Sequence, residues 1–402
     1  MRVLVLNPGS SSLKSSVVDA PAGAAPASEG GAAPAPLCSI DIDWGTDASA
    51  GADPADDIRG LLARYESAGI PQASLGAVGY RVVHGGTRFR SPVIVTPEVI
   101  AEVIALRDLA PLHNGVAAAT MAAGLQAAPD LPHVAVFDTA FHATLPEDAY
   151  RYPVPARWFE EWGVRRYGFH GLSVAWSAER AAALLARPIG ELRTVVAHLG
   201  SGCSVTAVEG GRSVATSMGL TPLEGLMMGT RAGSIDPGIM FYLIRTGRLD
   251  FAALADEMDH DSGLLGVSGR TSDVRELLVL EAAGDEAATM ALALFVRRAA
   301  ECIGAVATAL PALDALVFTG GIGENAAGLR SRIVARLGSL GVAPISDAAV
   351  AQDGVLAARD AAPAGGSAGG SAGGSAAAAS PAVLRIVARE DLIVAREAAR
   401  LV

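Results

Sequence analysis

VLVLNPGSSSLKSSVV, residues Val3 to Val18, joins two β-prone runs through a short polar segment. The first run stops at Asn7-Pro8-Gly9, a combination that ends strands and begins turns. The stretch therefore predicts a strand, a tight turn and a second strand. Backbone N–H groups and serine hydroxyls at such a turn form a concave set of donors suited to phosphate, and Lys14 adds a positive charge. The simpler alternative is a hairpin whose polar loop binds nothing.

Lys14 is exceptional in the composition of the chain. Among the 31 Lys and Arg residues it is the only lysine, since the other 30 are arginine. A compact ammonium group and a planar guanidinium are not interchangeable beside a phosphate. The single lysine next to the serine-rich turn favours the phosphate interpretation over the plain hairpin.

Length and composition limit the possible classes of protein. A chain of 402 residues is long enough for two domains, each with its own core. A net charge of −11 argues against a nucleic-acid partner, and no stretch approaches the ~20 apolar residues of a membrane span. The three cysteines are irregularly spaced and provide neither a disulfide framework nor a zinc site, which fits a reducing, cytoplasmic setting.

The pattern of the first hairpin returns in the second half of the chain. Residues Thr194 to Val208, TVVAHLGSGCSVTAV, again predict strand, Gly/Ser turn and strand. Two such hairpins indicate a duplicated domain with a ligand between the copies. We expect a domain over residues 1–150, completed by residues 383–402, and a second over residues 151–382. Low-complexity inserts are expected at residues 21–36 and 361–380, the latter flexible.

Other candidate groups follow predicted strands or lie in polar loops. Asp138 comes directly after a buried-type strand, His133 to Phe137, where α/β sheets usually carry ligand chemistry. A third Gly-rich turn, Thr319 to Asn325, is expected to precede a helix, and Arg81 and Arg231 lie in polar loops. Three phosphate-suited turns and two separated arginines predict a nucleotide and a second anionic ligand. Because the chain contains no GxxxxGK[ST] motif, it is not a P-loop protein, and we expect an ATP-dependent phosphotransferase of two similar α/β domains.

Nine motifs, in one order along the chain, resemble the acetate kinase family: NPGSSSLK, RVVHGG, PLHN, FDTAFH, RRYGFHG, HLGSGCS, TPLEGLMMGTRAGSIDP, SGLLGVSGRTSDVR and FTGGIGEN. The resemblance covers the chain apart from the two inserts. It implies two RNase H-like, actin-like ATPase domains, each a mixed sheet flanked by helices, with the active site in the cleft between them. It also implies a homodimer, ATP as co-substrate, and Mg²⁺, with Mn²⁺ as an alternative.

The resemblance also implies roles for individual residues. The catalytic residues it implies are Asp138, His170 and Arg231. The residues it implies around the substrate are Arg81, Val83, Leu112, Phe169 and Pro222. The metal site would involve Asn7 and Glu390. The nucleotide-binding residues it implies are Lys14, His198, Leu199, Gly200, Ser201, Gly202, Asp273, Val274, Arg275, Gly321, Ile322, Gly323, Glu324 and Asn325.

The reaction implied is reversible phosphorylation of acetate to acetyl phosphate by direct in-line transfer, with propionate or another short-chain acid as the alternative acceptor. Acetate is already a carboxylate at neutral pH, so Asp138 is expected to position the metal or its waters rather than remove a proton. Four positions depart from the usual family pattern: Val174, Ser201, Ser234 and Arg389, the last a cation beside Glu390. Two other classes stay open, a kinase for sugars or other alcohols and a non-catalytic nucleotide switch.

Overall fold

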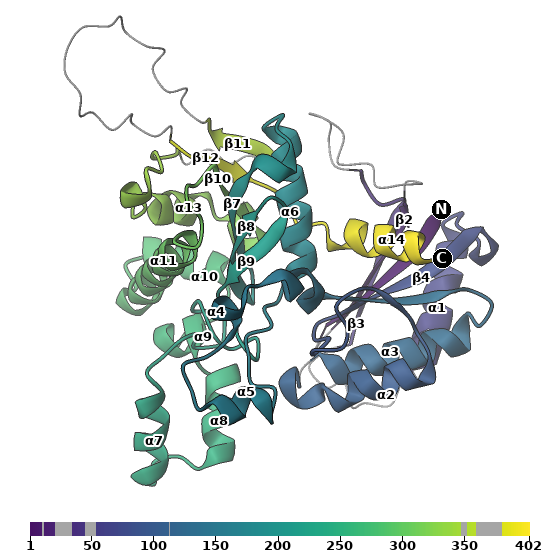
Figure 1. The fold of residues 1–402 in the computed structure, drawn as a ribbon, viewed down its shortest axis with the longest axis horizontal. Helices are drawn as coiled ribbons and strands as arrows, with labels where there is room; N and C mark the ends of the chain where they lie inside the picture. The colour runs from purple at the N-terminus through teal and green to yellow at the C-terminus, as the bar shows by residue number, and fades with distance from the viewer. Residues whose placement is uncertain (10–11, 21–33, 45–53, 112, 347–351, 359–379) are drawn as a thin grey trace, which may run out of the picture. The chain divides into compact units, whose positions relative to one another are not determined.

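The computed structural model describes the chain apart from residues 10–11, 21–33, 45–53, 112, 347–351 and 359–379 (Figure 1). The described residues divide into two compact units. Unit 1 contains Met1–Glu179, Leu220–Pro222 and Ala388–Val402, and unit 2 contains Arg180–Gly219 and Leu223–Val387. The domain boundaries expected from the sequence, near residues 150 and 382, remain a prediction.

A mixed six-stranded sheet forms the centre of unit 1. Its strands lie in the order β3 (Cys38–Asp43), β2 (Ser12–Asp19), β1 (Arg2–Pro8), β4 (Leu75–Val82), β6 (His133–Phe137) and β5 (Val93–Ile94). Strands β1, β4 and β6 are parallel, and the other pairings are antiparallel. The hairpin predicted from the first motif is confirmed, with Asn7 of β1 opposite Lys14 of β2.

Helices cover both faces of this sheet. Helix α14 (Glu390–Leu401) packs on β1, β4 and β6, and α3 (Asn114–Ala127) packs on the same strands. The approach of α14 is close, because a Cβ added at Gly79 would lie 2.7 Å from Val394 Cγ1. The remaining helices of unit 1 are α1 (Pro54–Ser67), α2 (Pro97–Ala105), α4 (Glu147–Tyr150) and α5 (Ala156–Glu160), and α6 (Gly171–Leu184) continues into unit 2.

Unit 2 contains a second six-stranded sheet. Its order is β11 (Gly354–Ala357), β12 (Ala382–Arg385), β10 (Ala315–Thr319), β7 (Arg193–Leu199), β8 (Cys203–Glu209) and β9 (Arg212–Thr216). The 22-residue helix α11 (Glu286–Ala307) packs on β7 and β8 and on α9 (Gly263–Ser268), α10 (Val274–Ala282) and α13 (Ala327–Val334). Helices α7 (Pro237–Arg245), α8 (Phe251–His260) and α12 (Gly320–Asn325) complete the set described for this unit.

The two sheets have the same topology. In each, three consecutive strands form an antiparallel meander, and its first strand pairs in parallel with the next long strand. The edge strands β5 and β11 both precede in sequence the strand they pair with. The expected fold, two α/β domains each with a mixed sheet flanked by helices, is therefore confirmed.

One local prediction was wrong. The Gly-rich segment Thr319 to Asn325 was expected to be a turn that precedes a helix. The helix that follows is confirmed, since α13 begins at Ala327, but Gly320–Asn325 forms the short helix α12 and not a turn. Gly320 makes this possible because its φ of +77° turns the chain directly from β10 into the helix. Within the described residues, no helix has the length and apolar character needed to cross a membrane.

Candidate active-site groups in the two units

The carboxyl edge of the parallel strands in unit 1 collects the charged residues. Asn7 lies near the end of β1, Arg81 near the end of β4, and Asp138 directly follows β6. Parallel strands end at the same edge of a sheet, so these side chains meet although their sequence positions are far apart. Helix α14 begins at this edge with Glu390, where the helix dipole also favours a carboxylate.

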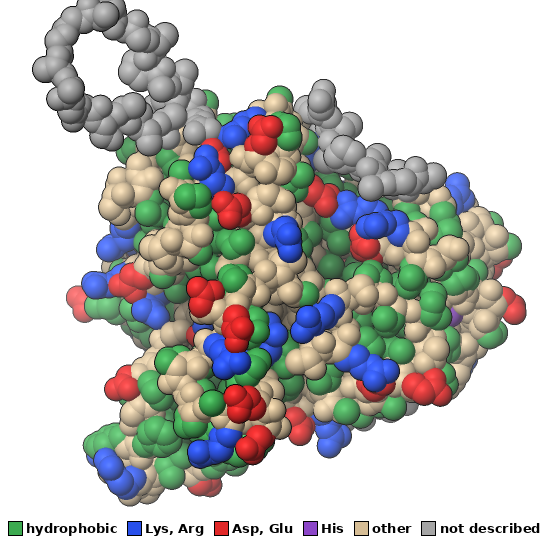
Figure 2. All heavy atoms as spheres, in the orientation of Figure 1, with side chains coloured by type: hydrophobic (Ala, Val, Ile, Leu, Met, Phe, Trp, Pro, Cys, Tyr) green, Lys and Arg blue, Asp and Glu red, His purple; other side chains and the backbone are tan. Residues whose placement is uncertain are grey.

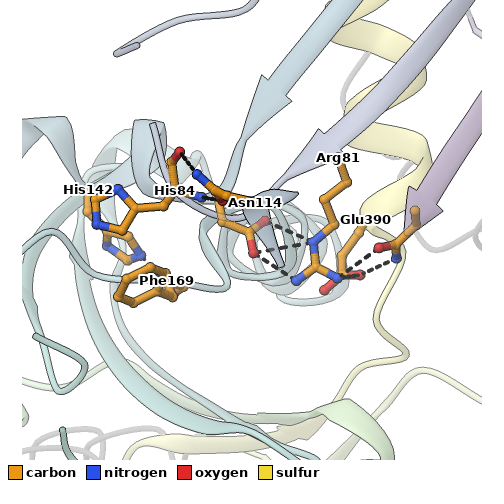
Figure 3. A network of polar contacts seen from close by, with 8 residues as sticks. Arg81, His84, Asn114, His142, Phe169 and Glu390 are labelled. Atoms are coloured by element: carbon orange, nitrogen blue, oxygen red, sulfur yellow. Dashed lines mark hydrogen bonds and ion pairs between the residues drawn. The ribbon is translucent and has the colours of Figure 1, made fainter. Parts of the chain in front are cut away.

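Arg81 is the centre of this cluster (Figure 3). Its Nε and Nη2 donate to the carboxylate of Asp138, with 2.7 Å between Nη2 and Oδ2. Its Nη1 donates to Glu390 Oε2 at 2.9 Å and to Asn7 Oδ1 at 3.4 Å. Burial alone would lower the pKa of Arg81, but the charges of Asp138 and Glu390 and the hydrogen bonds to Asp138 raise it above its ordinary value. The guanidinium therefore stays charged and is held in one orientation.

The donor set beside Arg81 suits a hard divalent cation. Asn7 and Glu390 present amide and carboxylate oxygens side by side, and Asn7 Nδ2 donates to Glu390 Oε2 at 3.4 Å. Mg²⁺ prefers such oxygens and is usually held by one or two carboxylates together with waters and substrate phosphates. No group of three or more His, Cys, Asp or Glu that could hold a metal occurs within the described parts of the chain. The residues thus fit a metal that arrives with phosphate better than a metal held by protein alone.

Three of the residues expected around the substrate, Val83, Phe169 and Pro222, lie in loop segments. Val83 is half-buried just after β4, Phe169 is buried, and Pro222 belongs to unit 1 and is half-buried. Phe169 packs edge-on against His84 with ring centroids 5.3 Å apart. Leu112 lies outside the described residues.

Asn114 and His84 form a hydrogen-bonded pair to which sequence reasoning assigned no role (Figure 3). Asn114 is fully buried, accepts from His84 N at 3.1 Å, and donates to His84 O at 2.9 Å. Burial lowers the pKa of His84 to about 4, so its ring is neutral at physiological pH. The scarcity of asparagine, with three in the whole chain, was the available signal for Asn114.

His170 has an unusual backbone conformation for a non-glycine residue. Its φ is +58°, in the left-handed region that costs L-residues energy. The next residue is Gly171, where an added Cβ would clash with the carbonyl oxygen of Asp138. The turn at His170 therefore packs closely against Asp138, and strained backbone of this kind is common at functional sites.

In unit 2, three of the expected nucleotide-binding segments lie close together. A Cβ at Gly320 would lie 2.8 Å from Leu199 O and 3.1 Å from His198 Nε2, so α12 starts against the β7–β8 turn. Gly229 N donates to Ser201 O at 3.1 Å, and a Cβ at Gly229 would lie 3.5 Å from Ser272 Cβ. Backbone groups rather than bulky side chains thus lie where three segments come together: the turn at residues 198–202, the start of α10 and the start of α12.

Two buried arginines hold the end of α12. Arg330 Nη1 donates to the carbonyl oxygens of Gly323 and Glu324, both at 2.8 Å, and Arg385 Nε donates to Glu324 O at 3.2 Å. Asn325 Nδ2 donates to Gly321 O at 2.9 Å inside the same helix. Because the last carbonyls of a helix have no partner within it, these cations fix a short helix that would otherwise fray.

Asp273 and Arg275 interact with each other at the start of α10. Asp273 accepts from Arg275 N at 2.8 Å as the helix N-cap and also forms an ion pair with the Arg275 guanidinium. The hydrogen bonds from Arg275 lower the pKa of Asp273 to about 2. Val274 is buried at the first position of the helix.

Arg231 lies in a loop closed by backbone contacts within unit 2. Met228 N donates to Arg231 O at 3.0 Å, and Ser234 donates to and accepts from Gly225. Burial lowers the pKa of Arg231, while the charge of Asp259 acts in the opposite direction. Ser234, which departs from the family pattern, therefore serves to close the loop.

The other departure that bears on the cluster is Arg389. Its guanidinium forms two hydrogen bonds of 2.8 Å with the carboxylate of Asp391 and a further bond with Pro34 O. The cation next in sequence to Glu390 is thus engaged by a different carboxylate.

Comparison with known proteins identifies consistent relatives. A model of the acetokinase family matches residues 2–361. The acetate kinase of Deinococcus radiodurans is 53% identical over 282 residues, which is 70% of this chain and 71% of the relative. The acetate kinase of Gloeobacter violaceus is 43% identical over 387 residues, which is 90% of this chain and 94% of the relative.

Solved structures have the same fold. The acetate kinase of Porphyromonas gingivalis aligns with a TM-score of 0.81 and 31% identity, over 100% of this chain and 99% of that chain. A propionate kinase from Francisella tularensis aligns with a TM-score of 0.78 and 33% identity, over 98% of each chain.

Proposed function

Because the chain belongs to the acetokinase family and is a kinase, we propose that it phosphorylates acetate with ATP, giving acetyl phosphate and ADP. A carboxylate oxygen of acetate attacks the γ-phosphorus of ATP in line, and the bond between that phosphorus and the β–γ bridging oxygen breaks. The reaction runs in both directions. Phosphoryl transfer needs positioning and charge neutralisation more than covalent help from the protein.

The observation that carries the proposal is the Arg81 cluster. A guanidinium fork suits planar carboxylates and phosphates, and here it is oriented by the buried carboxylate of Asp138. Acetate needs no general base, so Asp138 serves to hold Arg81 and the surrounding water in place. An alcohol kinase would instead need a base free to accept a hydroxyl proton, and Asp138 forms three hydrogen bonds with Arg81.

Cations and hydrogen-bond donors serve the transferred group. We assign His170 and Arg231 to the developing charge on the phosphoryl group and Lys14 to the nucleotide phosphates. The turn at residues 198–202, the start of α10 and helix α12 hold the nucleotide. Asn7 and Glu390 would hold Mg²⁺, or Mn²⁺ in its place, which would supply positive charge beside the phosphates.

A panel of acceptors tests the proposed reaction. ADP formation is measured with acetate, propionate, butyrate and glycerol at equal concentrations. We expect the highest kcat/KM with acetate and no turnover with glycerol. Turnover with glycerol alone would assign the chain to the alcohol kinases, and ATP binding without turnover of any acceptor would indicate a nucleotide switch.

Val83 is expected to set the preference among the acids. Its branched side chain should close the acetate pocket just beyond the methyl group, giving acetate over propionate and propionate over butyrate. One methylene in an apolar pocket is worth about 1–3 kcal/mol, or roughly 10- to 200-fold in kcat/KM. Val83→Ala should narrow or reverse the acetate-to-propionate ratio, because it makes room for the extra carbon and removes packing from the methyl group.

The control for Val83 is Val93→Ala, a half-buried valine of the edge strand β5. It should leave the ratio of kcat/KM values unchanged. The propionate kinase among the similar structures keeps the alternative substrate open. If the wild-type protein prefers propionate, or if Val83→Ala leaves the acetate-to-propionate ratio of kcat/KM unchanged, Val83 does not limit the depth of the acetate pocket.

We also propose that the protein is a homodimer formed through helix α7. No residue of α7 is buried, and it exposes Ile239, Phe241, Tyr242 and Ile244. Figure 2 shows hydrophobic side chains gathered over this helix, at the lower left of the view. An apolar face of this kind marks a surface that another protein covers, and the family resemblance favours a second copy of the chain.

Phe241→Glu is expected to break the dimer, since it places a charge on the most exposed apolar side chain of α7, 69% exposed. Light scattering after size-exclusion chromatography should give twice the chain mass of 40.7 kDa for wild type and the single mass for the variant. Val279→Glu, on α10 and 70% exposed, is the matched control and should remain dimeric. A wild-type monomer, or a dimeric Phe241→Glu variant, would contradict this interface.

We also propose a cytoplasmic location, which the three free cysteines support.

A further inference from the structure

A small hollow lies in unit 1 outside the Arg81 cluster. Its polar and aromatic lining comes from Arg90, Thr139, His142, Arg165 and Tyr167. These residues belong to three segments: the loop after β4, the 3₁₀ segment Asp138–Thr144 after β6, and the stretch that precedes Gly168. None of the residues assigned above to acetate, metal or nucleotide lines it.

The two arginines of this hollow have no carboxylate partner within the described structure. Arg90 Nε donates to Thr87 O at 3.2 Å, and Arg165 Nε donates to Arg166 O at 3.2 Å. The Arg165 guanidinium also lies over the Tyr150 ring at 3.7 Å and the Tyr167 ring at 5.5 Å, measured from Cζ to the ring centroids. Two cations thus face one hollow in orientations fixed by backbone and aromatic contacts.

The charges of Arg90 and Arg165 act on one another. Burial lowers the pKa of Arg165, Tyr167 and Tyr150 act in the opposite direction, and the positive charge of Arg90 again lowers it. His142 adds no third positive charge to the hollow, because burial lowers its pKa to about 4; its Nε2 is 2.9 Å from Phe169 O. A bound anion would neutralise both guanidinium groups.

A third donor is available in the wall of the hollow. Thr139 is 5% exposed, and its Oγ1 accepts from Gly85 N at 2.9 Å. A hydroxyl that accepts one bond still has its hydrogen to donate. Two guanidinium groups and one buried hydroxyl make a donor set that matches the oxygens of a small oxyanion.

We propose that this hollow is a second anion site, which binds the carboxylate or phosphate group of a small molecule between Arg90 and Arg165. The site is separate from the Arg81 cluster and does not depend on the proposed phosphoryl transfer. The Nε–H groups of Arg90 and Arg165 both donate to backbone carbonyls, and their NMR signals report on the two side chains separately.

The test is a titration of ¹⁵N-arginine-labelled protein with inorganic phosphate and, separately, with acetate, at ionic strength held constant with sodium chloride. The Nε–H signals of Arg90 and Arg165 are assigned by their loss in Arg90→Lys and Arg165→Lys. We expect both signals to shift together and to saturate with one apparent Kd. A response to phosphate alone identifies a phosphate site, and a response to acetate alone identifies a carboxylate site.

Substitutions test whether anion binding depends on the arginines that line this hollow. Arg165→Gln should weaken the Kd reported by the Arg90 signal about tenfold, since a charge-assisted contact is lost. Arg166→Gln and Arg88→Gln are the matched controls, because these neighbouring arginines do not line the hollow, and both should leave that Kd unchanged. Arg165→Lys keeps the positive charge and should weaken binding less than Arg165→Gln. Non-saturating shifts with both anions, or an equal effect of Arg166→Gln and Arg165→Gln, would overturn the proposal.

Discussion

Arg231→Ala is expected to lower kcat by about 10³- to 10⁵-fold, the range for loss of an arginine that stabilises the transferring phosphoryl group. The loop that carries Arg231 is closed through backbone bonds and through Ser234, so the substitution should leave the fold and the melting temperature nearly unchanged. Initial rates and KM for ATP and acetate measure the effect. Most of the loss should appear in kcat, because the interaction is made in the transition state.

One further variant of Arg231 and one control test whether its charge or its planar shape matters for the rate. Arg231→Lys keeps the charge but loses the planar fork, so it should recover only part of the lost rate. Arg297→Ala removes an exposed arginine paired with Glu301 on α11 and should have near-wild-type kinetics. Near-normal turnover by Arg231→Ala would remove Arg231 from the proposed mechanism.

Arg81→Ala should damage activity and stability together. The acetate KM should rise because a carboxylate contact is lost, and kcat should fall because the cluster loses its orienting cation. The variant also leaves the Asp138 carboxylate, 1% exposed, without its main partner. Breaking such a buried pair lowers the free energy of unfolding by about 3–5 kcal/mol. Denaturant unfolding and initial rates measure the two effects separately.

The double variant Arg81→Ala/Asp138→Asn separates the two roles of Arg81. It removes the unpaired buried charge, so part of the lost unfolding free energy should return, while activity stays low. Recovery of activity along with stability would mean that Arg81 acts only as a structural partner of Asp138. Arg180→Ala is the comparison, since it breaks a buried ion pair with Asp353 in unit 2, away from the assigned residues.

Sequence reasoning worked best where a local pattern dictates local structure. The strand His133–Phe137 has the predicted bounds, because a short apolar run is a local signal. Strand β3, Cys38–Asp43, was not predicted although CSIDID alternates along the chain with the partial burial of an edge strand. The predicted low-complexity insert ends at residue 36, and no element was assigned to the stretch that follows it.

The candidate site was predictable as a set of residues but not as a geometry. Strand-end reasoning identified Asp138, the polar-loop pattern identified Arg81, and the family resemblance implied Glu390. The contact among the three side chains depends on sheet order and on the packing of α14. Arg330 and Arg385 could not be recognised, because they contact α12 from α13 and β12 and only the fold brings them there. Their residue type alone is uninformative in a chain with 30 arginines.

The origin of the bridging oxygen in the product tests the proposed reaction most directly. The enzyme is incubated with ATP and acetate carrying ¹⁸O in both carboxylate oxygens, and the acyl phosphate is examined by ³¹P NMR. If a carboxylate oxygen attacks the γ-phosphorus, the product contains a P–¹⁸O bond and its phosphorus signal shows the isotope shift. Acyl phosphate without that shift would mean that the new bond formed at the carbonyl carbon, and absence of acyl phosphate would contradict the proposed function itself.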